Sequence, residues 1–149
     1  MAEKAAHLQT GSAGEDAAAS FARNLGWRIL ERNWRASGAR SCLELDIVAM
    51  DGSDLVFVEV KSRSAKTCAP LAAGAGIPVH AAFTSKKKAA LLRAATVYLT
   101  AKGLWHLPCR FDYMGVVFAQ NGTYQVEHQR HVIEAGHSVG CRHSSWQPW

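Results

Sequence analysis

Two stretches in which apolar and polar residues alternate predict a pair of β-strands near the middle of the chain. Residues 41–50 and 55–61 both follow the two-residue period of a strand. The segment between them, residues 51–54, contains an Asp-Gly step, which is a strong signal for a tight hairpin turn. The alternation places one set of apolar residues together on one face of the first strand: Leu43, Leu45, Ile47 and Ala49.

Closing this hairpin between residues 52 and 53 brings charged residues of the two strands together. Asp46 then lies opposite Glu59, and Glu44 lies opposite Lys61, all on one face. Opposed residues have Cβ atoms roughly 5 Å apart, so two like charges placed there repel each other. A divalent cation would relieve that repulsion, and carboxylate ligands favour Mg²⁺ or Mn²⁺. The alternative is a solvated face with a Glu44–Lys61 ion pair, but Phe57 would then be exposed to water as well.

A helix expected over about residues 13–25 carries a third acidic candidate. Ser12 and Glu15 form a Ser-x-x-Glu capping box, and Gly26 supplies the stop signal. Two explanations of Glu15 are equally good at this point. It is a capping residue, or it is an acid of the site, stabilised by the dipole at the start of the helix.

The remaining pattern completes one α/β domain over residues 1–135, followed by a polar tail over residues 136–149 that we expect to be flexible. Residues 64–83, rich in Ala and Gly, are interpreted as a mobile loop. The other expected elements are a strand at 27–34, a helix that begins near Thr84 or Ser85 and ends before Gly103, and strands at 109–119 and 123–133.

Composition favours an ordinary globular protein. The chain has 149 residues, of which 48% are hydrophobic and 19% charged, and no apolar stretch approaches the roughly 20 residues that span a bilayer. The first residues lack the order of a signal peptide, so we expect a cytoplasmic protein. The scattered cysteines, and a histidine-rich tail without compact ligand spacing, favour free thiols over disulfides or zinc. The four cysteines are Cys42, Cys68, Cys109 and Cys141.

The positive charge is concentrated in one part of the chain. Residues 60–111 contain nine Lys or Arg and no Asp or Glu, within a net charge of +5. Three consecutive lysines open the second helix, where cations oppose the helix dipole unless an anion binds. This pattern indicates either a polyanion-binding surface or a solvated basic face, and charge alone does not separate them.

Several motifs together resemble the YraN-type predicted endonucleases, a branch of the PD-(D/E)xK nuclease superfamily that is related to archaeal Holliday-junction resolvases. The resemblance covers about residues 11–133. It is carried by Gly14-Glu15, Arg32-Asn33-Trp34-Arg35, Glu44-Leu45-Asp46-Ile47-Val48, Val56-Phe57-Val58-Glu59-Val60-Lys61, Lys87, Ala94-Ala95, Tyr98-Leu99 and Arg110-Phe111-Asp112.

This resemblance implies an α/β fold with a restriction-endonuclease-like core, a central mixed five-stranded sheet flanked by helices. Matched by motif, Asp46 and Glu59 would be ligands of Mg²⁺ or Mn²⁺, with the carbonyl of Val60 as a further ligand. Lys61 would be the catalytic lysine, and Glu15 would complete or orient the site. The expected activity is metal-dependent hydrolysis of phosphodiester bonds.

The expected partner is DNA, branched or otherwise structured by resemblance to the resolvases, and the oligomeric state, monomer or homodimer, is open. The competing hypothesis is a nucleic-acid-binding protein of the same fold that does not cleave. Basic residues expected to hold the nucleic-acid backbone are Arg35, Arg63, Lys86, Lys87 and Lys88.

Overall fold

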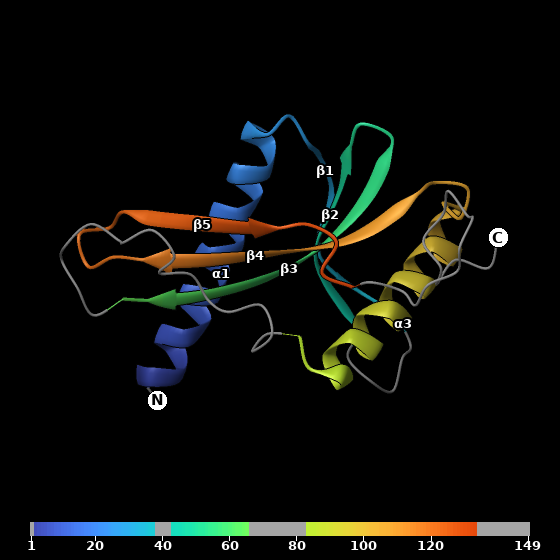
Figure 1. Ribbon diagram of the computed structural model, residues 1–149. Coiled ribbons are helices and arrows are strands. Elements are labelled where there is room, and N and C mark those ends of the chain that lie inside the picture. Colours follow the sequence, from blue (N-terminus) through green and yellow to red (C-terminus); the bar gives the residue numbers. More distant parts are fainter. Residues whose placement is uncertain (1, 38–42, 66–82, 134–149) are drawn as a thin grey trace.

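Two helices and five strands make up the described part of the fold (Figure 1). The structure is a computed structural model, and it describes residues 2–37, 43–65 and 83–133. The predicted loop at 64–83 and the predicted tail lie almost entirely outside these ranges. The elements are α1 (Ala2–Asn24), β1 (Arg28–Arg35), β2 (Glu44–Asp51), β3 (Asp54–Ser64), α3 (Ser85–Lys102), β4 (Cys109–Phe118) and β5 (Tyr124–Gln129).

The strands form one mixed sheet in the order β1-β2-β3-β4-β5. All neighbouring pairs are antiparallel except β3 and β4, which run parallel over the whole length of β4. A parallel pair needs a crossover, and α3 lies in the segment that connects these two strands. The interior strand β4 is buried along almost its full length because both faces of the sheet are covered. The predicted mixed five-stranded sheet is thereby confirmed.

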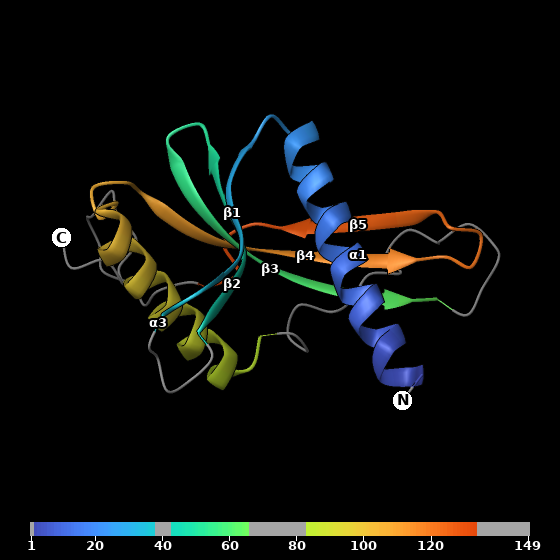
Figure 2. The ribbon, with the colours of Figure 1, turned by 180° about the vertical axis from the view of Figure 1, so that it is seen from behind.

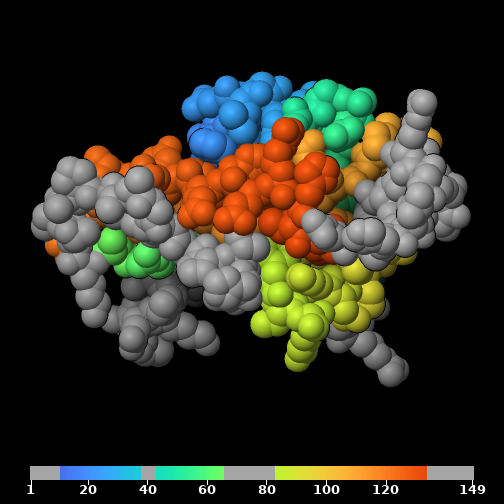
Figure 3. All heavy atoms as spheres, in the orientation of Figure 1, coloured from blue at the N-terminus to red at the C-terminus, as the bar shows by residue number. Residues whose placement is uncertain are grey.

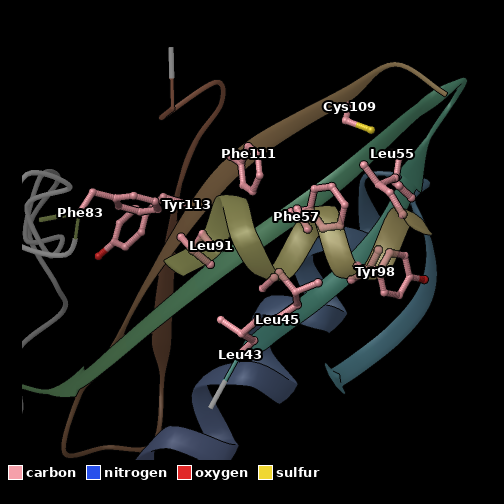
Figure 4. Close-up of a cluster of buried hydrophobic side chains, with 14 residues drawn as sticks. Leu43, Leu45, Leu55, Phe57, Phe83, Leu91, Tyr98, Cys109, Phe111 and Tyr113 are labelled. Carbon is pink, nitrogen blue, oxygen red and sulfur yellow. The ribbon is translucent and has the colours of Figure 1, made fainter. Parts of the chain in front are cut away.

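The two helices cover opposite faces of the sheet, as the front and back views show (Figures 1 and 2). Beneath α3 lies an aromatic and aliphatic core that includes Phe57, Tyr98 and Phe111 (Figure 4). The core beneath α1 uses small residues, among them Ala18 and Ala22, against valines of β3 and β4. Small side chains allow α1 to lie close to the sheet, and this proximity brings the part of α1 around Gly14 near β3.

Gly14 marks the closest approach between α1 and β3. A Cβ atom at Gly14 would lie 2.4 Å from the Cβ of Ser62, which is far inside van der Waals contact. Only glycine therefore fits at this position with the helix where it is. The contact fixes the height of α1 over the end of β3, and so fixes the position of the next residue, Glu15.

The predicted hairpin register is confirmed from the turn as far as Ile47 and Val58, whereas the predicted pairs Asp46–Glu59 and Glu44–Lys61 lie beyond the paired residues. Asp51 pairs with Asp54 and Ile47 pairs with Val58, so the turn is centred on residues 52 and 53. Gly52 has φ of +60°, a left-handed conformation that the Asp-Gly turn requires. Beyond Val58 the pairing between β2 and β3 ends, whereas β3 continues beside β4 as far as Ser64.

Two sequence-based expectations are wrong in detail. The first helix begins at Ala2 rather than near residue 13, so Ser12 is not its N-cap and Glu15 lies inside the helix, not at its positive end. Leu43 and Leu45 belong to the core under α3, whereas Ile47 belongs to the core under α1. The alternation is broken at Asp46, opposite Asn33, whose φ of +50° interrupts the regular strand β1.

Other expectations fit the structure. The helix α3 begins after the N-cap Thr84 and ends at Lys102, before the C-cap Gly103, as predicted. Cys109, the cysteine that the described residues include, is a buried thiol that donates to the Leu107 carbonyl at 3.3 Å, and burial raises its pKa to about 12. Neither described helix combines the length and the apolar character needed to cross a membrane.

Candidate functional site

The candidate site lies where β2 separates from β3. Asp46 closes the gap between the two strands, because its Oδ2 accepts a hydrogen bond from the backbone N–H of Val60 at 2.8 Å. The N–H and C=O of one strand residue point to the same side of the strand, so the Val60 carbonyl faces this gap as well. The end of β3 thus presents a carboxylate and a main-chain oxygen together.

Glu59 is the buried acid of the site. Its side chain is 2% exposed, on the face of β3 that carries the buried Phe57. Lys61 Nζ lies 3.2 Å from Glu59 Oε1, and Lys87 Nζ lies 2.8 Å from Oε2. Because Glu59 and Phe57 are buried, the alternative of a solvated face is ruled out. The ion pair expected in that alternative is also absent from the described residues, since Glu44 pairs with Arg35 at 3.2 Å instead of with Lys61.

One oxygen of this buried carboxylate lacks a hydrogen bond. Within the described residues, Glu59 Oε2 is buried with no hydrogen-bond donor in good geometry, although the Lys87 ammonium is near. The two observations agree if the contact with Lys87 is an attraction between charges without a well-directed N–H. A buried acceptor in this condition costs free energy, and a cation bound directly to the oxygen would remove that cost.

The pKa of Asp46 shows how strongly the acids interact. Burial and the negative charge of Glu59 raise the pKa of Asp46 to about 7, and Glu15 adds a smaller effect in the same direction. The Val60 N–H and the positive charge of Lys87 act against this increase. A carboxyl group whose pKa is brought near neutral pH by another carboxylate is typical of functional sites.

The two carboxylates and the Val60 carbonyl are oxygen donors of the kind that Mg²⁺ and Mn²⁺ bind. No three His, Cys, Asp or Glu side chains within residues 2–37, 43–65 and 83–133 are grouped closely enough to hold a metal ion. Glu15 is therefore a charged neighbour of Asp46 in this structure, and its role as a ligand stays a prediction. Magnesium sites with one or two carboxylates, completed by water and phosphate, are common.

The basic candidates do not all have the same role in the structure. Lys87 contacts Glu59, whereas Lys86 is exposed beside it on the first turn of α3 and Lys88 is half-buried. Arg63 is exposed near the end of β3. On the face shown in Figure 3, the end of β3 (green) and the start of α3 (yellow-green) both reach the surface.

A second charged cluster, which the sequence reasoning missed, lies on the α1 side of the sheet. Asp112 is fully buried and accepts hydrogen bonds from Arg110 Nε, from the ring of His128 at 3.0 Å and from the backbone N–H of His131 at 3.1 Å. Arg110 also lies over the ring of Trp27, with Cζ 5.2 Å from its centroid. The available signal was two opposite charges, two residues apart, on one face of an otherwise apolar strand.

Arg110 connects this cluster to the β2–β3 turn. Its Nη2 lies 2.7 Å from Asp51 Oδ2, and its Nη1 lies 3.2 Å from Asp54 Oδ2. Asp51 also pairs with Arg130. The guanidinium thus compensates the like charges that the tight turn places opposite each other, and it fixes the hairpin against β4.

An α/β protein with a mixed five-stranded sheet, a helix on each face and an acidic pair beside lysine at a strand end is consistent with a restriction-endonuclease-like core. The chain belongs to the family described as "Uncharacterised protein family UPF0102", whose model matches residues 14–116. The matched segment contains Glu15, the acidic pair and Lys87.

Similar proteins carry the same family name. The chain is 38% identical to the UPF0102 protein of Lawsonia intracellularis over 95% of its own length and 97% of that protein. It is 39% identical to the UPF0102 protein of Nitratidesulfovibrio vulgaris strain DP4, over 94% of this chain and 95% of the relative. A relative from Geobacter sulfurreducens is 38% identical over 83% of this chain and 88% of its own length. These names identify a family and no activity.

Proposed function

We propose that this protein is a metal-dependent endonuclease that hydrolyses phosphodiester bonds of DNA, with branched or structured DNA as its preferred substrate. The observation that carries the proposal is the end of β3. There Asp46 reaches across to the Val60 N–H, while the buried Glu59 lies 3.2 Å from Lys61. Placing two acids that repel each other close together costs folding free energy, even beside a lysine. This cost favours a functional over a structural explanation.

Asp46, Glu59 and the Val60 carbonyl would hold the metal ion, and Glu15 would add negative charge beside them. A bound Mg²⁺ or Mn²⁺ supplies Lewis-acid chemistry, which strengthens water as a nucleophile and offsets the charge of the reacting phosphate. Asp46 must be ionised to bind a cation, and its pKa of about 7 places that change near neutral pH.

Lys61 would stabilise the charge that develops on the phosphate in the transition state. Its side chain is 47% exposed, and its Nζ is held beside the site by Glu59 Oε1. A donor positioned before the reaction contributes more than a mobile one, because the protein does not reorganise when the charge develops. Exposed cations at both sides of the site, including Arg63 and Lys86, would hold the nucleic-acid backbone without reading its sequence.

A cleavage panel tests the proposal. The full chain is incubated with single-stranded, duplex, flap and four-way DNA in Mg²⁺ or Mn²⁺, and single-turnover rates are measured. We expect cleavage of at least one structured substrate, and Lys61→Met should slow it by about 10²–10³-fold while DNA affinity stays nearly unchanged. Normal cleavage by Lys61→Met would show that the nuclease mechanism is wrong.

A second candidate function is binding of nucleic acid without cleavage. It is favoured by the lysines that already hold both oxygens of Glu59, and by the lack of a three-acid group among the described residues. DNA binding with a steep salt dependence, but no cleavage by the parent protein with either metal on any substrate, would support this candidate over the first.

A further inference from the structure

Lys87 acts on both acids of the site. Its Nζ lies 2.8 Å from Glu59 Oε2, and its positive charge also lowers the pKa of Asp46. Lys61 contacts the other oxygen of Glu59, Oε1, at 3.2 Å. The Lys87 ammonium therefore lies against the buried Glu59 oxygen that lacks a hydrogen bond, where a bound cation would also lie.

We infer that Lys87 is a built-in counter-ion that a divalent cation displaces from Glu59, and that the freed lysine then holds a phosphate group of the nucleic acid. The inference rests on the metal site of the proposed function and deepens it. It gives Lys87 a role that differs from that of its neighbours on α3, because the same side chain responds to metal and to phosphate.

The contact between Lys87 and Glu59 is suited to exchange. The oxygen that faces Lys87 is buried but lacks a hydrogen bond in good geometry, so the ammonium satisfies its charge and not its hydrogen-bonding capacity. A divalent cation bound to the same oxygen brings twice the charge and coordinates the lone pair directly. The metal can therefore replace the lysine without leaving Glu59 as an uncompensated buried charge.

The first turn of α3 offers the displaced Lys87 side chain a second position, away from Glu59. The side chain of Lys87 is 35% exposed, and its backbone N–H is held by the N-cap Thr84 at 3.2 Å. No acidic residue lies in this first turn. A lysine that leaves Glu59 thus remains on a fixed, positively charged helix end beside Lys86, where a phosphate is the favourable partner.

Because metal and phosphate both draw the Lys87 side chain away from Glu59, the binding of one affects the binding of the other. A metal ion that frees Lys87 increases the affinity for phosphate, and a phosphate that draws Lys87 away increases the affinity for metal. Binding couplings of this kind are reciprocal by thermodynamic linkage. The protein would then load metal more readily when nucleic acid is already at the site.

Mn²⁺ binding by the full chain in the absence of DNA tests the inference, measured by calorimetry on the parent, Lys87→Met and Lys102→Met. Lys102 is the matched control, because it is on the same helix and its Nζ pairs with Glu31 at 2.5 Å, away from the site. We expect Lys87→Met to bind Mn²⁺ about tenfold more tightly than the parent. It should also melt at a lower temperature without metal, and Lys102→Met should bind Mn²⁺ like the parent. Parental or weaker Mn²⁺ affinity of Lys87→Met would overturn the inference.

A measurement on the unmodified chain covers the case in which Lys87→Met does not fold. Lysine side-chain NMR signals are followed during a Mg²⁺ titration, and those of Lys87 should move toward the positions of a solvated lysine while those of Lys102 stay in place. Unchanged Lys87 signals at saturating Mg²⁺ would refute the exchange. If the exchange occurs but no DNA is cleaved, the nuclease function alone is refuted.

Discussion

Two clusters of charge in this molecule use the same kinds of side chain and reach opposite results. At Asp112, burial is accompanied by hydrogen bonds from Arg110, His128 and a backbone N–H, and the pKa of the carboxyl is lowered despite its burial. At Asp46, burial is accompanied by the charge of Glu59, and the pKa is raised to about 7. Burial alone therefore does not decide the protonation state of an acid.

The difference indicates what each cluster is for. Asp112 has donors for both of its oxygens, and the cluster joins β4, β5 and the β2–β3 turn, so its role is to fix elements in place. The acids at the end of β3 have a buried oxygen without a hydrogen bond and two lysines at the edge of solvent. A cluster with unused bonding capacity is the one that can accept a ligand.

The largest loss of stability should come from removing Asp112, whose oxygens both accept hydrogen bonds. Asp112→Ala leaves the buried Arg110 guanidinium without its fully buried counter-charge, and we expect a loss of about 3–5 kcal/mol in the free energy of unfolding. Urea denaturation at pH 7 measures this loss. The control is Asp16→Ala, which removes an exposed partner of Arg32 and should cost no more than about 1 kcal/mol. Equal losses for both variants would contradict the structural role of Asp112.

A smaller loss should follow when α1 is forced away from the site. Gly14→Ala places a Cβ 2.4 Å from the Cβ of Ser62, and overpacking of this kind costs about 1–3 kcal/mol. Gly11→Ala is the matched control. Its Cβ would meet nothing within 4 Å, so it should stabilise the helix by about 0.5–1 kcal/mol. The test is a double-mutant cycle with Ser62→Gly, which should recover part of the Gly14→Ala loss.

The two acids should also differ in how stability depends on pH. The raised pKa of Asp46 means that the folded state keeps a proton between about pH 4 and pH 7 that the unfolded state has lost. The stability of the parent relative to Asp46→Asn should therefore fall as pH rises through that range. The stability of the parent relative to Asp112→Asn should instead be lost as pH falls below about 4, because the pKa of Asp112 is lowered in the folded state. Urea denaturation from pH 3.5 to 8 follows both differences, and parallel pH profiles would refute the contrast.

The smallest effect is the stabilisation by metal. Mg²⁺ at about five times its dissociation constant should stabilise the folded protein by about 1 kcal/mol, because it binds the folded state alone. Thermal unfolding with and without Mg²⁺ measures the shift. Asp46→Asn should lose the shift and Asp112→Asn should keep it. If Asp46→Asn keeps the full shift, the metal binds elsewhere.

The local parts of this structure were predictable from the sequence, and the long-range parts were not. The Asp-Gly turn and the alternation around it fix the register that brings Asp46 toward Glu59. The break at Asp46, which moves Leu45 to the other core, depends on the left-handed Asn33 in a neighbouring strand and has no periodic signal.

The lysine partners illustrate the same limit. Lys61 lies two residues after Glu59, so their shared face follows from strand geometry. Lys87 comes 28 residues after Glu59, and its contact with that acid depends on how α3 lies across the sheet. The first helix was predicted too short because Ser12 and Glu15 have the spacing of a capping box, although the helix continues through both of them.

The early departure of β2 from β3 has a consequence for the behaviour of the protein at high concentration. The pairing of β2 with β3 ends at Val58, whereas β3 continues beside β4 as far as Ser64. Charged side chains near the end of a strand oppose its pairing with another chain, and so oppose aggregation. Here Lys61 and Arg63 are exposed, and repulsion between like charges opposes the approach of a second copy. Replacing both cations by neutral residues would therefore test colloidal stability as well as catalysis, since the same side chains protect the opening that the site requires.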